Sequence, residues 1–287
     1  MISSRTSLRI VLSTLLLIAV LSVAFAQQPL FRFVQFSDTQ PTSEEGWANT
    51  AKAVEVINNL QPQPAFVLYG GDLTDRGAPA NAERLAAICA SLLAPLYPVP
   101  GNHDIPMVTS HDYQKYFGPE HWSMRYGNFK FVGLNTCAPY FMDGSDPDFV
   151  QWVDQELGDP TTPNRFVIGH YNLWDYNPDN RGGPAWLQEL FDKHQVIAYL
   201  HGHDHRFRYG YPQSSDTLNV SSWTVGGGGG FLGVDVYPEE ATLLKYRLQG
   251  GMEEAKTFHL TAEAKLPSPT PMSPWPGAVE VEAILAP

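Results

Sequence analysis

The chain of 287 residues carries a formal net charge of −12 at pH 7, with 43% hydrophobic and 12% aromatic residues. This hydrophobic content is ordinary for a globular enzyme. The excess of acidic residues argues against binding to nucleic-acid polymers, because contacts with phosphate depend on Lys and Arg. An acidic protein is better suited to a cleft that binds cations.

The first 26 residues have the pattern of a secretory signal peptide. Arg5 and Arg9 form a basic start, an apolar stretch covers residues 10–25, and Ala24-Phe25-Ala26 matches a cleavage site. The alternative is a transmembrane anchor, but the stretch is short of the roughly 20 apolar residues that a spanning helix needs. We therefore expect cleavage, export to the periplasm or the extracellular space, and a mature protein without a membrane anchor.

Apolar runs then alternate with amphipathic segments, which is typical of α/β layered domains. Apolar residues at intervals of three and four mark the helices. Strands are predicted over residues 31–36, 65–69, 96–100, 129–134, 165–168 and 196–200, and helices over residues 44–60, 78–93, 148–157 and 184–194.

The pattern changes after His205, where no helix is evident. Short strands are predicted over residues 218–225, 231–236, 241–248 and 255–260, and we expect them to complete a second sheet packed on the first. Gly226 to Gly230 could be a flexible linker, but the run lies between two β-rich segments, so a strand crossing where side chains do not fit is an equally good interpretation. Residues 27–265 would thus form one domain, and residues 266–287 a solvated, Pro-rich C-terminal tail.

The chain has two cysteines, Cys89 and Cys137. Export would permit a disulfide between them. Two buried free thiols are equally compatible with their positions, and both interpretations remain open. The pair lacks the Cys-x-x-Cys spacing of a zinc site.

Five of the predicted strands run directly into polar residues that can bind metals. They recur at intervals of about 30 residues, the length of a βα unit, with a longer gap that the strand at 129–134 fills. Ligands in open α/β sheets bind at the carboxyl ends of the strands, so these side chains should converge. The residues that follow the five strands are Asp38, Asp72, Asn102, His170 and His203.

Carboxylate and amide oxygens combined with imidazole nitrogens suit Mn, Fe, Zn or Mg. Two divalent ions about 3.5–4 Å apart need a bridging carboxylate, and such a pair clamps a phosphoryl group. Asp72 follows Gly71, so its carboxylate could lie close to both ions.

The ordered motifs resemble those of the calcineurin-like metallophosphoesterases. They are Asp38-x-Gln40, Gly71-Asp72-x-x-Asp75, Gly101-Asn102-His103-Asp104, Gly169-His170 and Gly202-His203-x-His205. The resemblance covers residues 31–230 and implies a two-sheet β-sandwich flanked by helices, a four-layer αββα fold. It also implies a metal-dependent hydrolase of phosphoric esters, either a phosphatase or a phosphodiesterase.

The resemblance also assigns roles to single residues. His103 would be the general acid and Asp104 would orient it, a metal-bridging hydroxide would be the nucleophile, and Asp75 and Arg76 would brace the loop. One of two divalent ions would be held by Asp38, Asp72 and His205, and the other by Asp72, Asn102, His170 and His203. His201 lies just outside the last motif, and its role stays open.

Gln40 departs from the family, which usually has His at this position of the first motif. A neutral amide oxygen is a weaker ligand than an imidazole nitrogen for most first-row ions. Gln40 would therefore bind its metal weakly, bind through water, or not bind. A noncatalytic secreted binding protein on the same scaffold, with a weakened first metal site, is the alternative function.

The expected substrate is a small phosphate ester or a phosphoprotein. Specificity would lie in the loops over residues 105–125, 171–183 and 206–217. Their aromatic side chains could stack on a substrate or serve in packing, and both uses remain open. These side chains are Tyr113, Trp122, Trp174, Tyr176, Phe207 and Tyr209.

Overall fold

The computed structural model describes residues 27–109, 111–139, 141, 144–173, 184–212 and 215–267. The predicted signal peptide, Trp174, Tyr176 and all of the predicted tail beyond residue 267 lie outside the described residues. Among the described helices, none combines the length and the apolar character that a bilayer crossing requires.

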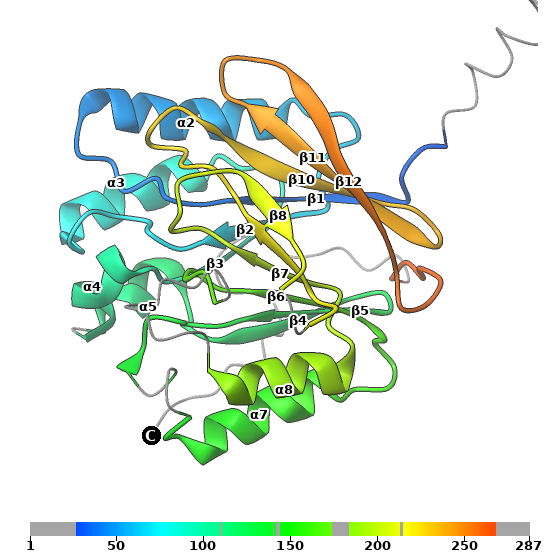
Figure 1. Cartoon of the computed structure of the whole chain (residues 1–287). Coiled ribbons are helices and arrows are strands. Elements are labelled where there is room, and N and C mark those ends of the chain that lie inside the picture. Colours follow the sequence, from blue (N-terminus) through cyan, green and yellow to red (C-terminus); the bar gives the residue numbers. More distant parts are fainter. Residues whose placement is uncertain are drawn as a thin grey trace, which may run out of the picture.

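Two six-stranded mixed sheets form the centre of the molecule (Figure 1). In spatial order, the first sheet contains β12 (Met252–His259), β11 (Glu240–Arg247), β10 (Gly230–Val236), β1 (Phe31–Phe36), β2 (Phe66–Gly70) and β3 (Leu96–Val99). The second contains β4 (Trp122–Tyr126), β5 (Phe129–Gly133), β6 (Asn164–Ile168), β7 (Ala198–His201), β9 (Leu218–Ser221) and β8 (Arg208–Gly210).

Helices cover the outer face of each sheet, which gives the four-layer αββα arrangement that the motifs imply (Figure 1). The first sheet is covered by α2 (Glu44–Asn58) and α3 (Pro79–Cys89), with α4 (Ile105–Thr109), α5 (Asp112–Phe117) and the short 3₁₀ helix η1 (Asn102–Asp104) at the carboxyl ends of its strands. The second is covered by α7 (Pro147–Leu157) and α8 (Ala185–His194).

The strands are apolar on both faces because both faces are buried. On β1, Phe33 packs between the sheets, where its ring meets Phe131 of β5 at 5.2 Å, while Val34 packs under the helices. The same alternation on each central strand produces three apolar layers, one between the sheets and one beneath each helix pair.

The helix starts follow from local sequence. The Ser43 hydroxyl accepts a hydrogen bond from the Gly46 backbone N–H at the start of α2, and Asp146 caps α7 in the same way ahead of Pro147. Such caps satisfy backbone donors that the helix leaves unpaired and stabilise it by about 1 kcal/mol. Proline is well tolerated at the first helical position.

The expectation that all strands after His205 complete the second sheet is wrong for three of them. Strands β8 and β9 join the second sheet, but β10, β11 and β12 extend the first, with β10 antiparallel to β1. Arg32 of β1 and Asp235 of β10 lie opposite each other and form a buried ion pair through two bonds of 2.5 and 2.7 Å. The two side chains can form both bonds only if they lie opposite each other, so this ion pair is compatible only with β1 and β10 as adjacent strands.

The glycine run forms a turn that leads into β10, not a strand crossing. Space is nevertheless restricted, since a Cβ atom on Gly226 or Gly230 would overlap the backbone of a neighbouring strand or loop.

Cys89 and Cys137 are both free thiols, which decides between the two alternatives left open by the sequence.

Buried His121 should make stability depend on pH. Its Nδ1 accepts a hydrogen bond of 3.0 Å from the Asn135 backbone, its ring lies 4.4 Å from that of Phe149, and burial lowers its pKa from 6.5 to about 3. Below pH 6.5, His121 of the unfolded chain therefore binds a proton that His121 of the folded chain does not bind. The free energy of unfolding that comes from keeping His121 neutral is complete above pH 6.5 and falls by about 2 kcal/mol by pH 5.

Urea unfolding between pH 7 and pH 5 measures this effect. His121→Asn keeps an acceptor near the Asn135 amide and should flatten the pH dependence by about 2 kcal/mol. His111→Asn, at an exposed position, is the matched control. An unchanged slope in His121→Asn would show that this imidazole does not couple folding to protons.

Candidate metal centre

The predicted ligands converge at one edge of the two sheets. Strands β1, β2 and β3 run parallel, as do β5, β6, β7 and β9, so their carboxyl ends face the same edge. Asp72, His170 and His203 bring one ligand atom each to within 4.8 Å of one another, and Asp38, Asp72 and His205 do the same. Asp72 belongs to both groups, as a bridging ligand must.

The backbone is turned sharply at four of these residues. Asp38, Asp72, His203 and His205 have φ values of 54°, 54°, 70° and 55°, in the left-handed region that side chains with a Cβ disfavour. Each costs about 1–2 kcal/mol and persists only where the surroundings impose it. Such strain gathers at functional sites.

Hydrogen bonds between the loops hold this geometry. The Asp38 N–H donates to the Gly71 carbonyl and the Gln40 N–H to the Asp72 carbonyl, both at 3.0 Å. The His203 N–H donates to Asp38 Oδ1 at 2.9 Å. The strand-end loops of β1, β2 and β7 are thereby tied to one another.

The group around His170 has the donor set of a cation site. Its Nδ1 lies 2.8 Å from the Gly70 carbonyl oxygen, which can only accept, so Nδ1 carries a proton. In the neutral ring, Nε2 is then a lone-pair donor, and it lies 3.0 Å from Asn102 Oδ1 and 3.3 Å from Asp72 Oδ1. Three electron-rich atoms facing one another are compatible with a bound cation.

Without a cation, a proton has to neutralise this cluster. Burial alone would lower the pKa of His170, but the Asp72 carboxylate outweighs it and raises that pKa to about 9. Burial would likewise raise the pKa of Asp72, and the charge of His170 lowers it. A metal ion would take the place of that proton, because metal ligands bind in their deprotonated form.

The second group is more open to solvent. His205 has 44% of its side chain exposed, and its Nε2 lies 3.4 Å from Asp38 Oδ1 and 3.3 Å from the Gln40 amide nitrogen. The hydrogen bond to Asp38 raises the pKa of His205. The buried Oε1 of Gln40 has no hydrogen-bond partner among the described residues, as expected of an oxygen reserved for a cation or a water bound to one.

Replacing Gln40 with histidine should tighten one of two metal sites by about tenfold, because imidazole is the stronger ligand. Calorimetric titration with Mn²⁺ measures both sites, and Gln151→His on the exposed face of α7 is the matched control. Unchanged affinity and stoichiometry in Gln40→His would show that Gln40 is not a ligand.

The Asp104 carboxylate, which the motif predicts to orient His103, is bonded to backbone amides. It is fully buried, and its carboxylate accepts hydrogen bonds of 2.9 Å from the backbone N–H groups of Leu73, Thr74 and Gly101. Burial raises its pKa to about 6. Asp104 therefore ties the loop after β2 to the loop after β3.

The ring of His103 is instead paired with Asp75, at 2.9 Å between Nδ1 and Oδ1. The His103 side chain is 38% exposed beside the ligand groups, and its backbone N–H donates to Asp72 Oδ1 at 2.9 Å. Asp75 was expected only to brace the loop. The only sequence signal for a functional role of Asp75 was its position three residues after Asp72. That Asp75 is the partner of His103 could not be recognised without the fold.

Glycine is required where the loops meet. Gly71 has a φ of 84°, and a Cβ there would lie 2.6 Å from the His170 ring. A Cβ on Gly101 would overlap the backbone of Asp72.

His201, whose role the sequence left open, is not in either ligand group. Its Nδ1 lies 2.8 Å from the Gly202 carbonyl.

The family model for calcineurin-like phosphoesterases matches residues 31–207, more than half of the chain. The chain belongs to this family. The matched region contains all of the ligand groups described above, and the resemblance of the five motifs to the calcineurin-like phosphoesterases is confirmed.

Relatives within this family have names of two kinds. A probable cyclic nucleotide phosphodiesterase from Synechococcus is 29% identical over 56% of this chain and 66% of its own length. Serine/threonine-protein phosphatase CPPED1 from Danio rerio is 30% identical over 55% of this chain and 59% of its own length. The matched region thus spans less than two thirds of either relative.

Solved structures share the fold. A dimetal phosphatase from Danio rerio superimposes with a TM-score of 0.64 at 14% identity, covering 82% of this chain and all of that one. A purple acid phosphatase from yellow lupin gives 0.63 at 16% identity, covering 86% of this chain and 58% of that one. The four-layer calcineurin-like architecture of this chain is therefore established.

Proposed function

We propose that this protein is a hydrolase of phosphoric esters that uses two divalent metal ions. The observation that carries the proposal is the pair of ligand groups that share Asp72. One ion would be held by Asp38, Asp72 and His205, with Gln40 as a weak or water-mediated ligand. The other would be held by Asp72, Asn102, His170 and His203.

When bound, two such ions neutralise the phosphoryl oxygens and supply an activated water. The donor set is compatible with Mn, Fe, Zn or Mg. In the hydrolysis, water adds to phosphorus and the P–O bond to the alcohol breaks.

His103 would protonate the departing alcohol oxygen from Nε2. Its Nδ1 donates to Asp75, which fixes the orientation of the ring. Both residues lie beside Asp72, because the His103 backbone is bonded to that carboxylate. Asp104 would act only by holding the two loops together.

The substrate would be a small phosphate ester or a phosphoprotein, in keeping with relatives named phosphodiesterase and phosphatase. The net charge of −12 disfavours nucleic-acid polymers as partners.

The pattern over residues 1–26 supports export without a retained anchor. N-terminal sequencing of the protein from its native envelope fraction should find cleavage after Ala26, and an intact leader would contradict export by this route.

Hydrolysis of p-nitrophenyl phosphate and its bis ester, with Mn²⁺ added to metal-stripped protein, tests the proposal. Turnover of at least one ester should depend on the metal and cease with chelator. The alternative, a noncatalytic binding protein on this scaffold, rests on the substitution of Gln40. Protein that binds two ions but turns over neither ester would favour that alternative.

A further inference from the structure

Two cations and two aromatic rings gather at the edge of the sheets that carries the metal centre. They belong to Phe207, Trp223, Lys245 and Arg247, which we call the cation–aromatic cluster. Lys245 Nζ lies 4.6 Å from the centre of the Trp223 ring and 5.5 Å from that of Phe207. The Arg247 guanidinium carbon lies 5.0 Å from the centre of the Trp223 ring. Aromatic faces attract cations at such distances, so the rings help to hold both charges in place.

Strand register places the cluster beside the metal centre. Strand β11 runs in the same direction as β1, because both are antiparallel to β10, which lies between them. Lys245 of β11 and Gln35 of β1 both pair with Leu232, so Arg247, two residues further on, is level with the carboxyl end of β1. Since neighbouring strands are about 4.8 Å apart, the Arg247 backbone lies about 10 Å from the end of β1, where the first metal ligand follows.

The two aromatic residues are connected directly to the ligand loops. Phe207 lies two residues after His205. Trp223 precedes Thr224, whose hydroxyl donates a hydrogen bond of 2.9 Å to the Asp38 carbonyl oxygen. The cluster therefore adjoins the more exposed of the two ligand groups.

The cluster has positive charge and donors to spare. The Lys245 ammonium has three hydrogen-bond donors, and no acceptor among the described residues lies within hydrogen-bond distance of them. The Glu253 carboxylate is 3.7 Å from Lys245 Nζ and pairs with Arg247 at 2.9 Å, while 46% of the Arg247 side chain stays exposed. Two cations thus face one carboxylate, and the remaining positive charge attracts an anion.

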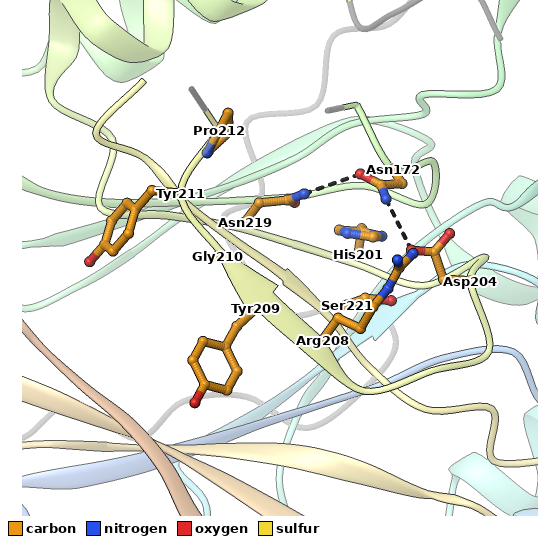
Figure 2. Close-up of a pocket in the computed structure, with 10 residues that line it drawn as sticks. All are labelled: Asn172, His201, Asp204, Arg208, Tyr209, Gly210, Tyr211, Pro212, Asn219 and Ser221. Atoms are coloured by element: carbon orange, nitrogen blue, oxygen red, sulfur yellow. Dashed lines mark hydrogen bonds and ion pairs between the residues drawn. The ribbon is translucent and has the colours of Figure 1, made fainter. Parts of the chain in front are cut away.

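Arg208, one residue after Phe207, does not add to this charge. Its guanidinium lies 2.6 Å from Asp204 Oδ2 in a separate polar pocket, and none of the four cluster residues lines that pocket (Figure 2). An anion that binds at the cluster therefore meets Lys245 and Arg247 and not Arg208.

We propose that the cation–aromatic cluster binds an acidic side chain of a phosphopeptide whose phosphoryl group lies at the metal centre. This rests on the proposed function and narrows its substrate to phosphorylated segments with acidic residues close by. A separation of about 10 Å is too long for a small ester, but an extended chain covers it in about three residues. The peptide carboxylate accepts charge-assisted hydrogen bonds from Lys245 and Arg247. The net charge of −12 disfavours such a peptide elsewhere on the surface, so these two cations fix where it binds.

Two phosphoserine peptides form a matched test. One has alanine next to the phosphoserine and glutamate two and three positions away on both sides, and the other has glutamine at the same four positions. Phosphate release from the glutamate peptide should be favoured by about tenfold in kcat/KM at low salt, and the preference should shrink as salt is added. Lys245→Met should bring the ratio near one while the metal content stays at the wild-type value. Arg247→Gln serves if Lys245→Met impairs folding, and Lys193→Met, which breaks an ion pair on α8, is the control.

Equal turnover of the two peptides by the wild-type protein, or a preference that survives both substitutions, would overturn the subsite. Titration with the same peptides carrying unmodified serine, followed by the NMR signal of the Trp223 indole N–H, does not require turnover. The glutamate peptide should give a saturable shift that the glutamine peptide does not. A shift without hydrolysis of any ester would reject the proposed enzyme and keep the cluster as a binding site. Hydrolysis with neither shift nor preference would reject the cluster alone.

Discussion

Asp72→Asn should lower the rate of ester hydrolysis by on the order of a thousandfold or more. The carboxylate belongs to both ligand groups, and an amide leaves one ion without an anionic ligand. The pairing that sets the pKa values of Asp72 and His170 would also be lost. Kinetics with Mn²⁺, together with metal analysis after gel filtration, measure both effects.

Asp148→Asn, at an exposed position of α7, is the matched control for the same chemical change. It should retain wild-type turnover and metal content. If Asp72→Asn kept two tightly bound ions and normal turnover, Asp72 would not be the bridging ligand.

His103→Gln should lower kcat by about 10²–10⁴-fold for alkyl esters. The loss should be much smaller for p-nitrophenyl esters, because p-nitrophenolate leaves without needing a proton. Metal content should stay unchanged, since His103 is not in either ligand group. A plot of log kcat against the pKa of the leaving alcohol is the measurement.

Asp75→Asn is the companion variant, because it removes the charge that faces His103 Nδ1 at 2.9 Å. It should show the same leaving-group dependence in weaker form. Equal losses for alkyl and nitrophenyl esters in His103→Gln would show that this histidine acts on binding or on structure and does not protonate the alcohol.

The central fold was predictable because its strands are buried on both faces. Largely apolar runs such as residues 31–36 and 165–168 read as strands from the sequence alone, and the polar residue after each marks the carboxyl edge. Strand β8 (Arg208–Gly210) was missed because its three residues are exposed and leave no apolar pattern. Strand β4 (Trp122–Tyr126) was missed although it alternates and leads through Gly127-Asn128 into β5.

Sheet membership was harder to predict than strand position. The strands after residue 230 look alike in sequence, and the contact that accompanies the pairing of β10 with β1, the buried pair of Arg32 and Asp235, joins residues 203 positions apart. The partner of His103 poses the same problem at the site. Asp75 and Asp104 are both near it in the motifs, and only the fold shows that Asp104 is committed to three backbone amides.

Anomalous diffraction from crystals of the Mn²⁺-loaded protein tests the central claim most directly. The account predicts two peaks about 3.5–4 Å apart, with the Asp72 carboxylate between them and His170 and His205 on opposite sides. A single peak, or peaks away from Asp72, would contradict it.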